Sequence, residues 1–269
     1  MKPKVLVLTG YGINCDEETA FAFQINGAKA DIVHINDLIS GQYKLSDYQI
    51  LAFPGGFSYG DDTGSGKALA NKIRNNLWQD ILDFIGSEKL VIGICNGLQI
   101  LTNLGLLPAG EENYGTREVA LKHNKTARFE CRWVNLKISS KKCIFTKGVK
   151  NIYLPIAHGE GNFYASTETL KSLSQNDQIA VQYTLENGSS ANGKFPFNPN
   201  GSLEDIAGIC DPTGRVFGLM PHPERAIFAI NSPDFQSGKE RLIRDSKEIP
   251  MHYEPAMQIF KNAVQYFDK

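Results

Sequence analysis

One stretch of the chain decides the fold: Lys89-Leu-Val-Ile-Gly-Ile-Cys95-Asn-Gly-Leu-Gln99-Ile-Leu101. Residues 90–94 form an apolar run, which predicts a buried strand. From Leu98 to Leu106 the apolar residues recur at helical spacing, which predicts an amphipathic helix. Cys95 lies where the two meet, so the pattern predicts a strand-to-helix turn with a thiol at its tip.

The glycines on both sides of this cysteine give it the layout of a nucleophile elbow. Gly93-x-Cys95-x-Gly97 has cysteine where the better-known version of the motif has serine. Such a turn strains the backbone of the nucleophile and needs neighbours without a Cβ atom. The N-terminus of the following helix favours the thiolate. We therefore predict that Cys95 is a nucleophile. The other cysteines lack this frame, and we interpret them as inert buried residues: Cys15, Cys131, Cys143 and Cys210.

A cysteine nucleophile needs a base, and the base needs an acceptor that orients it. Both occur in the stretch Val216-Phe-Gly-Leu-Met-Pro-His222-Pro-Glu224-Arg225. An apolar run ends just before His222, which places this residue at the end of a strand, where α/β enzymes hold their chemistry. The sequence thus predicts a triad of Cys95, His222 and Glu224. Three other histidines carry no such context, and we interpret them as structural: His34, His123 and His252.

Strand-like and helix-like segments alternate along the first half of the chain. We expect strands over 4–9, 30–35, 48–53 and 90–94, and helices over 17–26, with Asp16 as its cap, and 67–85. This alternation predicts an α/β fold with a doubly wound, mostly parallel sheet flanked by helices. The second half reads as mixed β structure, with strands over 128–138, 151–157, 179–183, 205–209 and 215–220. We expect a loop over 186–202, an irregular polar stretch over 228–254 and a helix over 256–267, all within one domain of residues 1–269.

Composition narrows the function classes. The chain has 269 residues, of which 42% are hydrophobic, enough for a sizeable core. A net charge of −1 argues against non-specific nucleic-acid binding. No segment has the roughly 18 apolar residues of a membrane span, and the apolar run 5–8 is too short for a signal peptide. Five cysteines without close pairs suggest a reducing compartment, so we expect a cytoplasmic protein without nucleic-acid or membrane partners.

Two glycine-rich loops follow predicted strands. The first, Pro54-Gly-Gly-Phe-Ser-Tyr-Gly-Asp-Asp62, is either an oxyanion hole that presents backbone N–H groups to the elbow or an ordinary turn. The second is Ile156-Ala-His158-Gly-Glu160-Gly-Asn162. Gly64-Ser-Gly-Lys67-Ala fails the spacing of a phosphate loop. The two His-x-Glu pairs lack the Pro-Cys-x-x-Cys of zinc deaminases, so no metal site is expected.

Together these motifs resemble the class I, or triad, glutamine amidotransferases, a family with a flavodoxin-like sheet. Gly93-x-Cys95-x-Gly97-x-Gln99 and His222-Pro-Glu224 are its signatures. The resemblance is closer to one branch, the glutaminase subunits that serve a separate synthase in purine biosynthesis. The matching stretches extend over nearly the whole chain: Gly12-x-Asn-Cys-Asp16, the loop 54–61, Pro155-Ile-Ala-His-Gly-Glu-Gly-Asn162, Asn198-Pro-Asn-Gly-Ser202 and Gly218-Leu-Met-Pro-His-Pro-Glu-Arg225.

The resemblance implies a role for each matching residue. Cys95 would attack the side-chain amide of glutamine, His222 would transfer protons and Glu224 would orient it. Backbone N–H groups of Gly56 and Asn96 would stabilise the oxyanion. The walls of the glutamine pocket, or of the contact with the partner, would be Gly55, Gln99, His158, Gly159 and Glu160.

The resemblance also implies partners. Ammonia would pass to a large synthase subunit that uses ATP and Mg²⁺, with a small accessory subunit beside it, and this chain would hold no cofactor. Three alternatives remain: the glutaminase of another synthetase, a free-standing γ-glutamyl hydrolase and a non-catalytic regulatory subunit of the same fold. The chain departs from the branch at residues 62–66, at Leu98 and in its length. The extra segment 228–254 would extend the partner surface or, as we favour, form a solvated loop.

Overall fold

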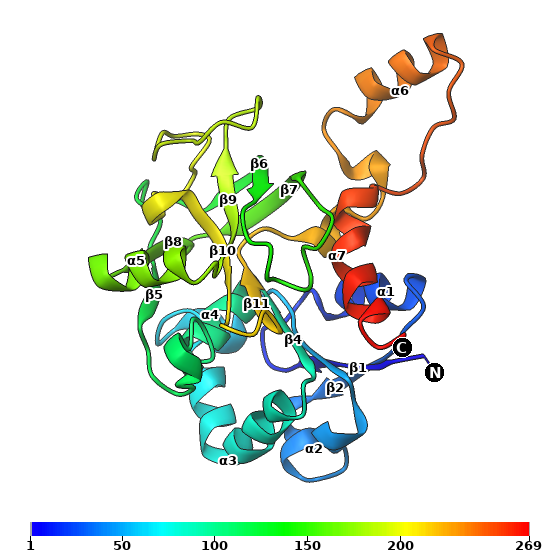
Figure 1. Cartoon of the computed structure of the whole chain (residues 1–269). Coiled ribbons are helices and arrows are strands. Elements are labelled where there is room, and N and C mark those ends of the chain that lie inside the picture. Colours follow the sequence, from blue (N-terminus) through cyan, green and yellow to red (C-terminus); the bar gives the residue numbers. More distant parts are fainter. Residues whose placement is uncertain (1, 269) are drawn as a thin grey trace.

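A nine-stranded sheet forms the centre of the molecule in the computed structural model, which describes residues 2–268 (Figure 1). Its central strands, 50–53, 90–94, 206–210 and 216–219, are buried at every position, as expected for strands covered on both faces. Across the sheet the order is β2 (Lys29–His34), β1 (Lys4–Thr9), β3 (Ile50–Phe53), β4 (Leu90–Ile94), β11 (Val216–Leu219), β10 (Ile206–Cys210), β9 (Ile179–Thr184), β6 (Glu130–Ile138) and β7 (Asn151–His158). A separate pair joins β5 (Val119–Lys122) to β8 (Asn162–Ala165).

The strand directions decide where the chemistry lies. Pairing is parallel across β2-β1-β3-β4-β11 and antiparallel at the four remaining junctions. Each antiparallel junction reverses the strand direction, so β10 and β6 run opposite to the parallel strands, and β9 and β7 run with them. Seven of the nine strands therefore share one direction. The predicted α/β class, with a mostly parallel sheet and a mixed second half, is confirmed. The order β2-β1-β3-β4-β11 is that of flavodoxin-like sheets.

Helices cover the parallel half of the sheet on both sides (Figure 1). Phe23 of α1 (Asp16–Ile25) packs edge to face on Phe260 of α7 (Glu254–Gln265), with ring centroids 5.1 Å apart. On the other side α3 (Lys67–Gly86) buries Leu69, Ile73 and Leu77 next to α4 (Asn96–Leu104). The remaining helices are α2 (Ile35–Ile39), α5 (Thr167–Gln175) and α6 (Phe235–Arg244). Within residues 2–268, every helix is too short or too polar to cross a bilayer.

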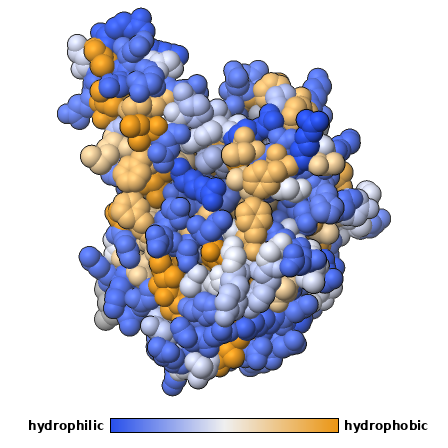
Figure 2. Space-filling model, turned by 180° about the vertical axis from the view of Figure 1, so that it is seen from behind, coloured by the Kyte–Doolittle hydropathy of each residue, from blue (hydrophilic) through white to orange (hydrophobic). Residues whose placement is uncertain are grey.

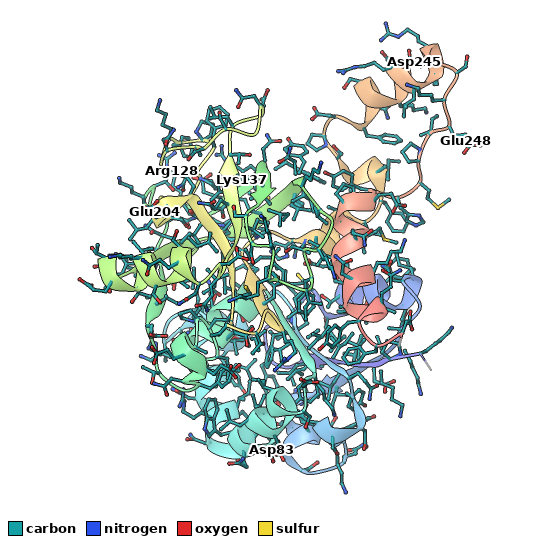
Figure 3. All side chains as sticks on the ribbon, in the orientation of Figure 1. Asp83, Arg128, Lys137, Glu204, Asp245 and Glu248 are labelled. Atoms are coloured by element: carbon teal, nitrogen blue, oxygen red, sulfur yellow. The ribbon has the colours of Figure 1, made fainter. Side chains whose placement is uncertain are left out.

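The segment 228–254 contradicts the expectation of an irregular stretch. It contains α6, and an isolated bridge between Phe228 and His252, whose rings stack, closes its base. We call residues 228–252 the arm. It projects from the body, with Asp245 and Glu248 at its far end (Figures 1 and 3). No residue of α6 is buried, and its apolar residues Phe235, Leu242 and Ile243 are outnumbered by polar and charged ones, which is why the sequence reads as a polar stretch.

Other expectations need smaller corrections. Asp16 does not cap α1; the helix begins at Asp16, and its carboxylate accepts a hydrogen bond from Thr9 Oγ1 at 2.5 Å. Sequence reasoning missed the short elements α2, β5 and β8. It also missed α5, although Ser166 caps this helix by accepting a hydrogen bond from the Thr169 N–H. The loop over 186–202 is confirmed.

Candidate active site

The predicted site residues come from strands that run in the same direction. Loops 10–15, 54–61 and 159–161 follow β1, β3 and β7, Cys95 follows β4, and His222 follows β11. Carboxyl ends of strands with a common direction meet at one edge of a sheet. The sheet therefore brings together segments that are far apart in the sequence.

The turn at Cys95 has the geometry of a nucleophile elbow. Cys95 adopts φ 52° and ψ −104°, a conformation that residues with a Cβ atom rarely adopt. Its N–H donates to Leu219 O at 2.8 Å, which fixes the turn against β11. A Cβ atom on Gly97 would lie 2.0 Å from Phe53 O of β3, and one on Gly93 would lie 2.7 Å from the carbonyl carbon of Gly97. Both glycines are thus required by close packing, as the motif predicts.

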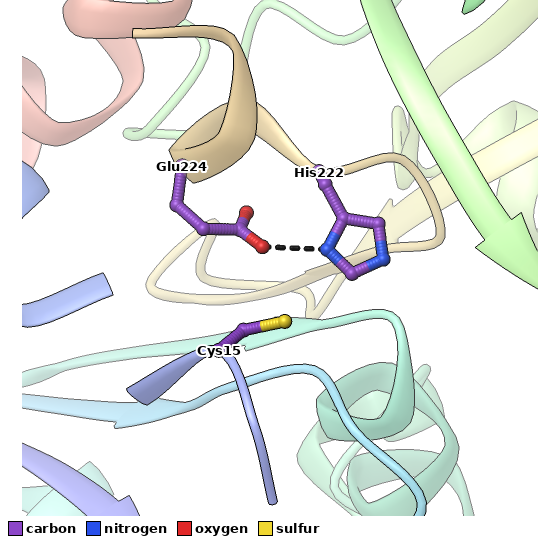
Figure 4. A group of neighbouring side chains, drawn as sticks. All are labelled: Cys15, His222 and Glu224. Carbon is purple, nitrogen blue, oxygen red and sulfur yellow. Dashed lines mark hydrogen bonds and ion pairs between the residues drawn. The ribbon is translucent and has the colours of Figure 1, made fainter. Parts of the chain in front are cut away.

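His222 and Glu224 form a buried pair beside this turn (Figure 4). His222 Nδ1 lies 2.5 Å from Glu224 Oε1, and both side chains are almost fully buried. Burial lowers the pKa of His222, but the charges of Glu224 and Cys95 and a contact with Cys15 outweigh it, so its pKa lies well above the ordinary value. Because Nδ1 faces the carboxylate, Nε2 is the atom left to exchange a proton; it has no partner among the described residues.

Cys15 belongs to this site, although the sequence analysis treats it as an inert residue. Arg225 Nη2 lies 2.8 Å from Cys15 Sγ, and Figure 4 shows the thiol pointing toward the His222 ring. The motif Gly12-x-Asn-Cys-Asp16, which follows β1, contains this cysteine. Cys15 comes close to the triad because β1 lies next to β3, and β3 lies next to β4. Cys143 and Cys210 are buried as expected, whereas Cys131 is exposed, so that part of the interpretation is wrong.

One group of described residues gathers donor atoms that zinc accepts. The donor atoms of Cys15, His222 and Glu224 lie within 4.8 Å of one another. These atoms already have partners, since Nδ1 is bonded to the carboxylate and the Arg225 guanidinium lies against the sulfur. A positive side chain at the sulfur disfavours a cation there. That this chain binds no metal stays a prediction.

The two predicted oxyanion donors lie at the ends of neighbouring strands. Loop 12–15 pairs with loop 55–57, because Asn14 N–H and Cys15 N–H donate to Gly55 O and Phe57 N–H donates to Gly12 O. Among the described residues, the N–H groups of Gly56 and Asn96 have no protein acceptor. Free N–H groups of this kind are what an oxyanion hole offers. A Cβ atom on Gly55 would lie 2.7 Å from His222 Cε1, so Gly55 provides room for the imidazole.

A network of side chains holds Asn96 in place. Its Nδ2 donates to Gln99 Oε1 at 2.8 Å and to Asp61 Oδ1 at 3.2 Å, and its Oδ1 accepts from Ser58 N–H. Gln99 Nε2 donates to Glu160 O at 2.6 Å, so both ends of its amide are occupied. Burial raises the pKa of Asp61. Sequence reasoning quoted Asp61 within a motif but assigned it no role; it supports the oxyanion loop.

The loop after β7 is held at both ends. His158 is buried, and its Nδ1 lies 3.1 Å from Asn124 Oδ1. Gly159 O accepts from the Asn124 N–H, and Glu160 Oε2 accepts from the Ser65 N–H at 3.3 Å. The Glu160 side chain is 20% exposed, so this carboxylate can be reached by a ligand from solvent.

Comparisons with known proteins agree on one family. The model of a CobB/CobQ-like glutamine amidotransferase domain matches residues 2–267. The chain is 57% identical over 267 residues to the phosphoribosylformylglycinamidine synthase subunit PurQ of Methanococcus maripaludis, a match that covers 99% of the chain and 98% of that relative. It is 42% identical over 266 residues to the subunit of the same name from Dehalococcoides mccartyi, and the match covers 98% of both.

Solved structures show the same likeness. A chain in the structure of PurLQS from Thermotoga maritima is 31% identical, with a TM-score of 0.71 over 99% of both chains. A glutamine amidotransferase from the same organism is 15% identical, with a TM-score of 0.53 over 98% of this chain and 97% of the other. The second match shows a common fold alone.

Proposed function

The chain belongs to the CobB/CobQ-like glutamine amidotransferase family, and on that premise we propose that it is the glutaminase subunit of phosphoribosylformylglycinamidine synthase. It would hydrolyse glutamine to glutamate and ammonia for de novo purine biosynthesis. The family resemblance seen in the sequence is thereby confirmed. Full-length identity of 57% to a PurQ subunit supports this function over a different amidotransferase.

The buried His222–Glu224 pair next to the strained Cys95 is the observation that carries the proposed chemistry. Cys95 as thiolate attacks the amide carbon of glutamine, and the N–H groups of Gly56 and Asn96 stabilise the oxyanion. His222 gives its Nε2 proton to the leaving nitrogen, which departs as ammonia. It then takes a proton from water, which hydrolyses the γ-glutamyl thioester.

The remaining site residues form the surroundings of the substrate. Gly55, His158 and Gly159 line the pocket next to the triad, and Gln99 supports it from behind through Asn96. The Glu160 carboxylate is placed to meet the α-ammonium group of glutamine, because it is the acidic group of this loop that solvent reaches.

Ammonia would pass to the large synthase subunit, which converts formylglycinamide ribonucleotide to the amidine with ATP and Mg²⁺. A small accessory subunit would complete the assembly, as the match to PurLQS supports. This chain itself would need no cofactor. We place the reaction in the cytoplasm, where the free thiols of the described chain stay reduced.

The test is glutamate release from glutamine, measured for the chain alone and with the synthase subunits, ATP and formylglycinamide ribonucleotide. We expect a strong rise on adding the partners and substrates. Cys95→Ala should abolish glutamine-dependent synthesis and leave ammonia-dependent synthesis intact. Brisk turnover by the chain alone, indifferent to those additions, would identify a free-standing hydrolase instead.

A further inference from the structure

His158 is a buried histidine for which the proposed mechanism has no step. It ends β7, where Ala157 O lies 3.8 Å from Cys95 Sγ and Pro155 O accepts the His222 N–H at 2.9 Å. The end of this strand therefore contacts both the nucleophile and the base.

The tautomer of His158 follows from its neighbour Asn124. Asn124 Nδ2 donates to Arg128 O at 2.9 Å and to His158 O at 2.8 Å, which fixes the orientation of the amide. Asn124 Oδ1 accepts from the Gly161 N–H at 3.0 Å and is therefore also the acceptor for His158 Nδ1. The proton of the imidazole is on Nδ1, and Nε2 carries a lone pair.

This lone pair has no partner. His158 is 2% exposed, and its Nε2 forms no hydrogen bond with any residue of the described chain. Burial and the positive charge of His222 lower the pKa of His158 to about 3, so the ring stays neutral at physiological pH. A buried acceptor left without a donor is unfavourable, so the site suits a ligand that supplies an N–H or O–H group.

The group that donates to this nitrogen must not be a cation. The nearby His222 charge and the burial that keep His158 neutral also disfavour an ammonium ion at this place. A neutral amide nitrogen and neutral ammonia both meet these conditions, and both occur in the reaction.

We propose that His158 Nε2 accepts a hydrogen bond from the side-chain amide nitrogen of bound glutamine, and then from the ammonia that this nitrogen becomes. This role rests on the proposed function. Cys95 Sγ bonds to the amide carbon, the C–N bond breaks, and His222 supplies the one proton that turns the departing NH₂ group into NH₃. His158 neither gains nor loses a proton. It holds the amide in line for cleavage and then holds the ammonia that is released.

Two matched variants separate this role from packing. His158→Asn places an amide near the Nδ1 position, which keeps the contact with Asn124 and removes the acceptor at Nε2. His158→Gln places an amide oxygen near the Nε2 position. In the assembled synthase, glutamate release is measured from glutamine and from glutamate γ-methyl ester, whose leaving oxygen has no N–H to donate.

We expect His158→Asn to lower kcat/KM for glutamine about tenfold or more and to leave kcat/KM for the ester within about twofold, while His158→Gln restores part of the loss. An equal loss for both substrates would overturn the proposal, because a structural role, or a role in binding the hydrolytic water, affects both. Unchanged kinetics with glutamine would overturn it as well.

A third variant covers the case in which His158→Asn does not fold. A Cβ atom on Gly161 would lie 2.3 Å from His158 Cε1 and 2.8 Å from its Nε2, so Gly161→Ala must displace the ring. It should show the same selective loss for glutamine.

The ester comparison needs no transfer of ammonia. If the wild-type complex makes no product from glutamine, the proposed function fails, and the His158 proposal is still tested by glutamate release.

Discussion

At the scale of residues, His222 is the centre of the site, because Glu224, Cys95 and Cys15 all act on its charge. Glu224 is fully buried, and its Oε1 is bonded to Nδ1. This arrangement keeps the proton donor charged at a pH at which an ordinary histidine has lost its proton.

Glu224→Gln should shift the pH dependence of the reaction. The carboxylate raises the pKa of His222, so its removal lowers that pKa, and the protonated form is lost at a lower pH. The alkaline limb of kcat/KM for glutamine should move to lower pH, and the maximum rate should fall roughly 10²- to 10⁴-fold. Glutamate release across the pH range measures both. An unmoved alkaline limb would show that another group controls it.

Cys15→Ala tests the second thiol. Cys15 also raises the pKa of His222, so its loss should move the same limb to lower pH while turnover stays within about tenfold of wild type. Cys143→Ala is the matched control, because Cys143 is a buried cysteine outside this cluster. Mass spectrometry of the acyl-enzyme identifies the nucleophile. A thioester that is lost in Cys15→Ala and retained in Cys95→Ala would reverse the assignment.

At the scale of elements, the elbow depends on how closely α4 approaches β3. Gly97→Ala would place a Cβ atom 2.0 Å from Phe53 O, a backbone atom of a buried strand that cannot move aside. We expect a loss of about 3 kcal/mol in the free energy of unfolding, measured by urea denaturation.

The control for that change is Gly86→Ala at the end of α3, where a Cβ atom would have nothing within 4 Å. It should leave the stability unchanged or raise it by up to about 1 kcal/mol, because alanine favours helix more than glycine does. Equal effects of the two substitutions would contradict the packing argument.

The sequence predicted elements well where short-range signals agreed. The strand 90–94 and the elbow at Cys95 follow from an apolar run and two glycines, and both are present. Cys15 was misread because its position depends on the order of strands, a long-range property. For the arm the reason is composition: α6 has three apolar residues, Phe235, Leu242 and Ile243, among polar and charged ones, so the segment reads as polar although it is helical.

At the scale of the whole molecule, the catalytic side chains are buried. Cys95 is 5% exposed and His222 is 1% exposed, so solvent reaches little of either residue. The most exposed large apolar residues include Ile230, Ile243 and Met251 of the arm, which Figure 2 shows as a projection with both hydrophobic and hydrophilic residues. The arm thus offers exposed apolar side chains that a partner could contact, whereas the catalytic side chains are buried.

The burial of Cys95 predicts that reagents modify it slowly. Iodoacetamide should alkylate Cys95 in the chain alone more slowly than Cys131, which is exposed. Adding the synthase subunits with their substrates should accelerate the reaction at Cys95 and not at Cys131, because assembly opens the site. Peptide mass spectrometry at successive times measures the alkylation of Cys95 and of Cys131 separately. Equal rates at Cys95 with and without partners would mean that the site opens by itself.

The position of β11 has a consequence for synthesis of the protein. This strand comes late in the chain but lies at the centre of the sheet, between β4 and β10, and it carries the base of the site at its end. A growing polypeptide on the ribosome therefore exposes the unpaired edge of β4 until residues 216–219 have emerged. An incomplete chain that ends before His222 therefore has the thiol of Cys95 without its base, and we expect it not to hydrolyse glutamine.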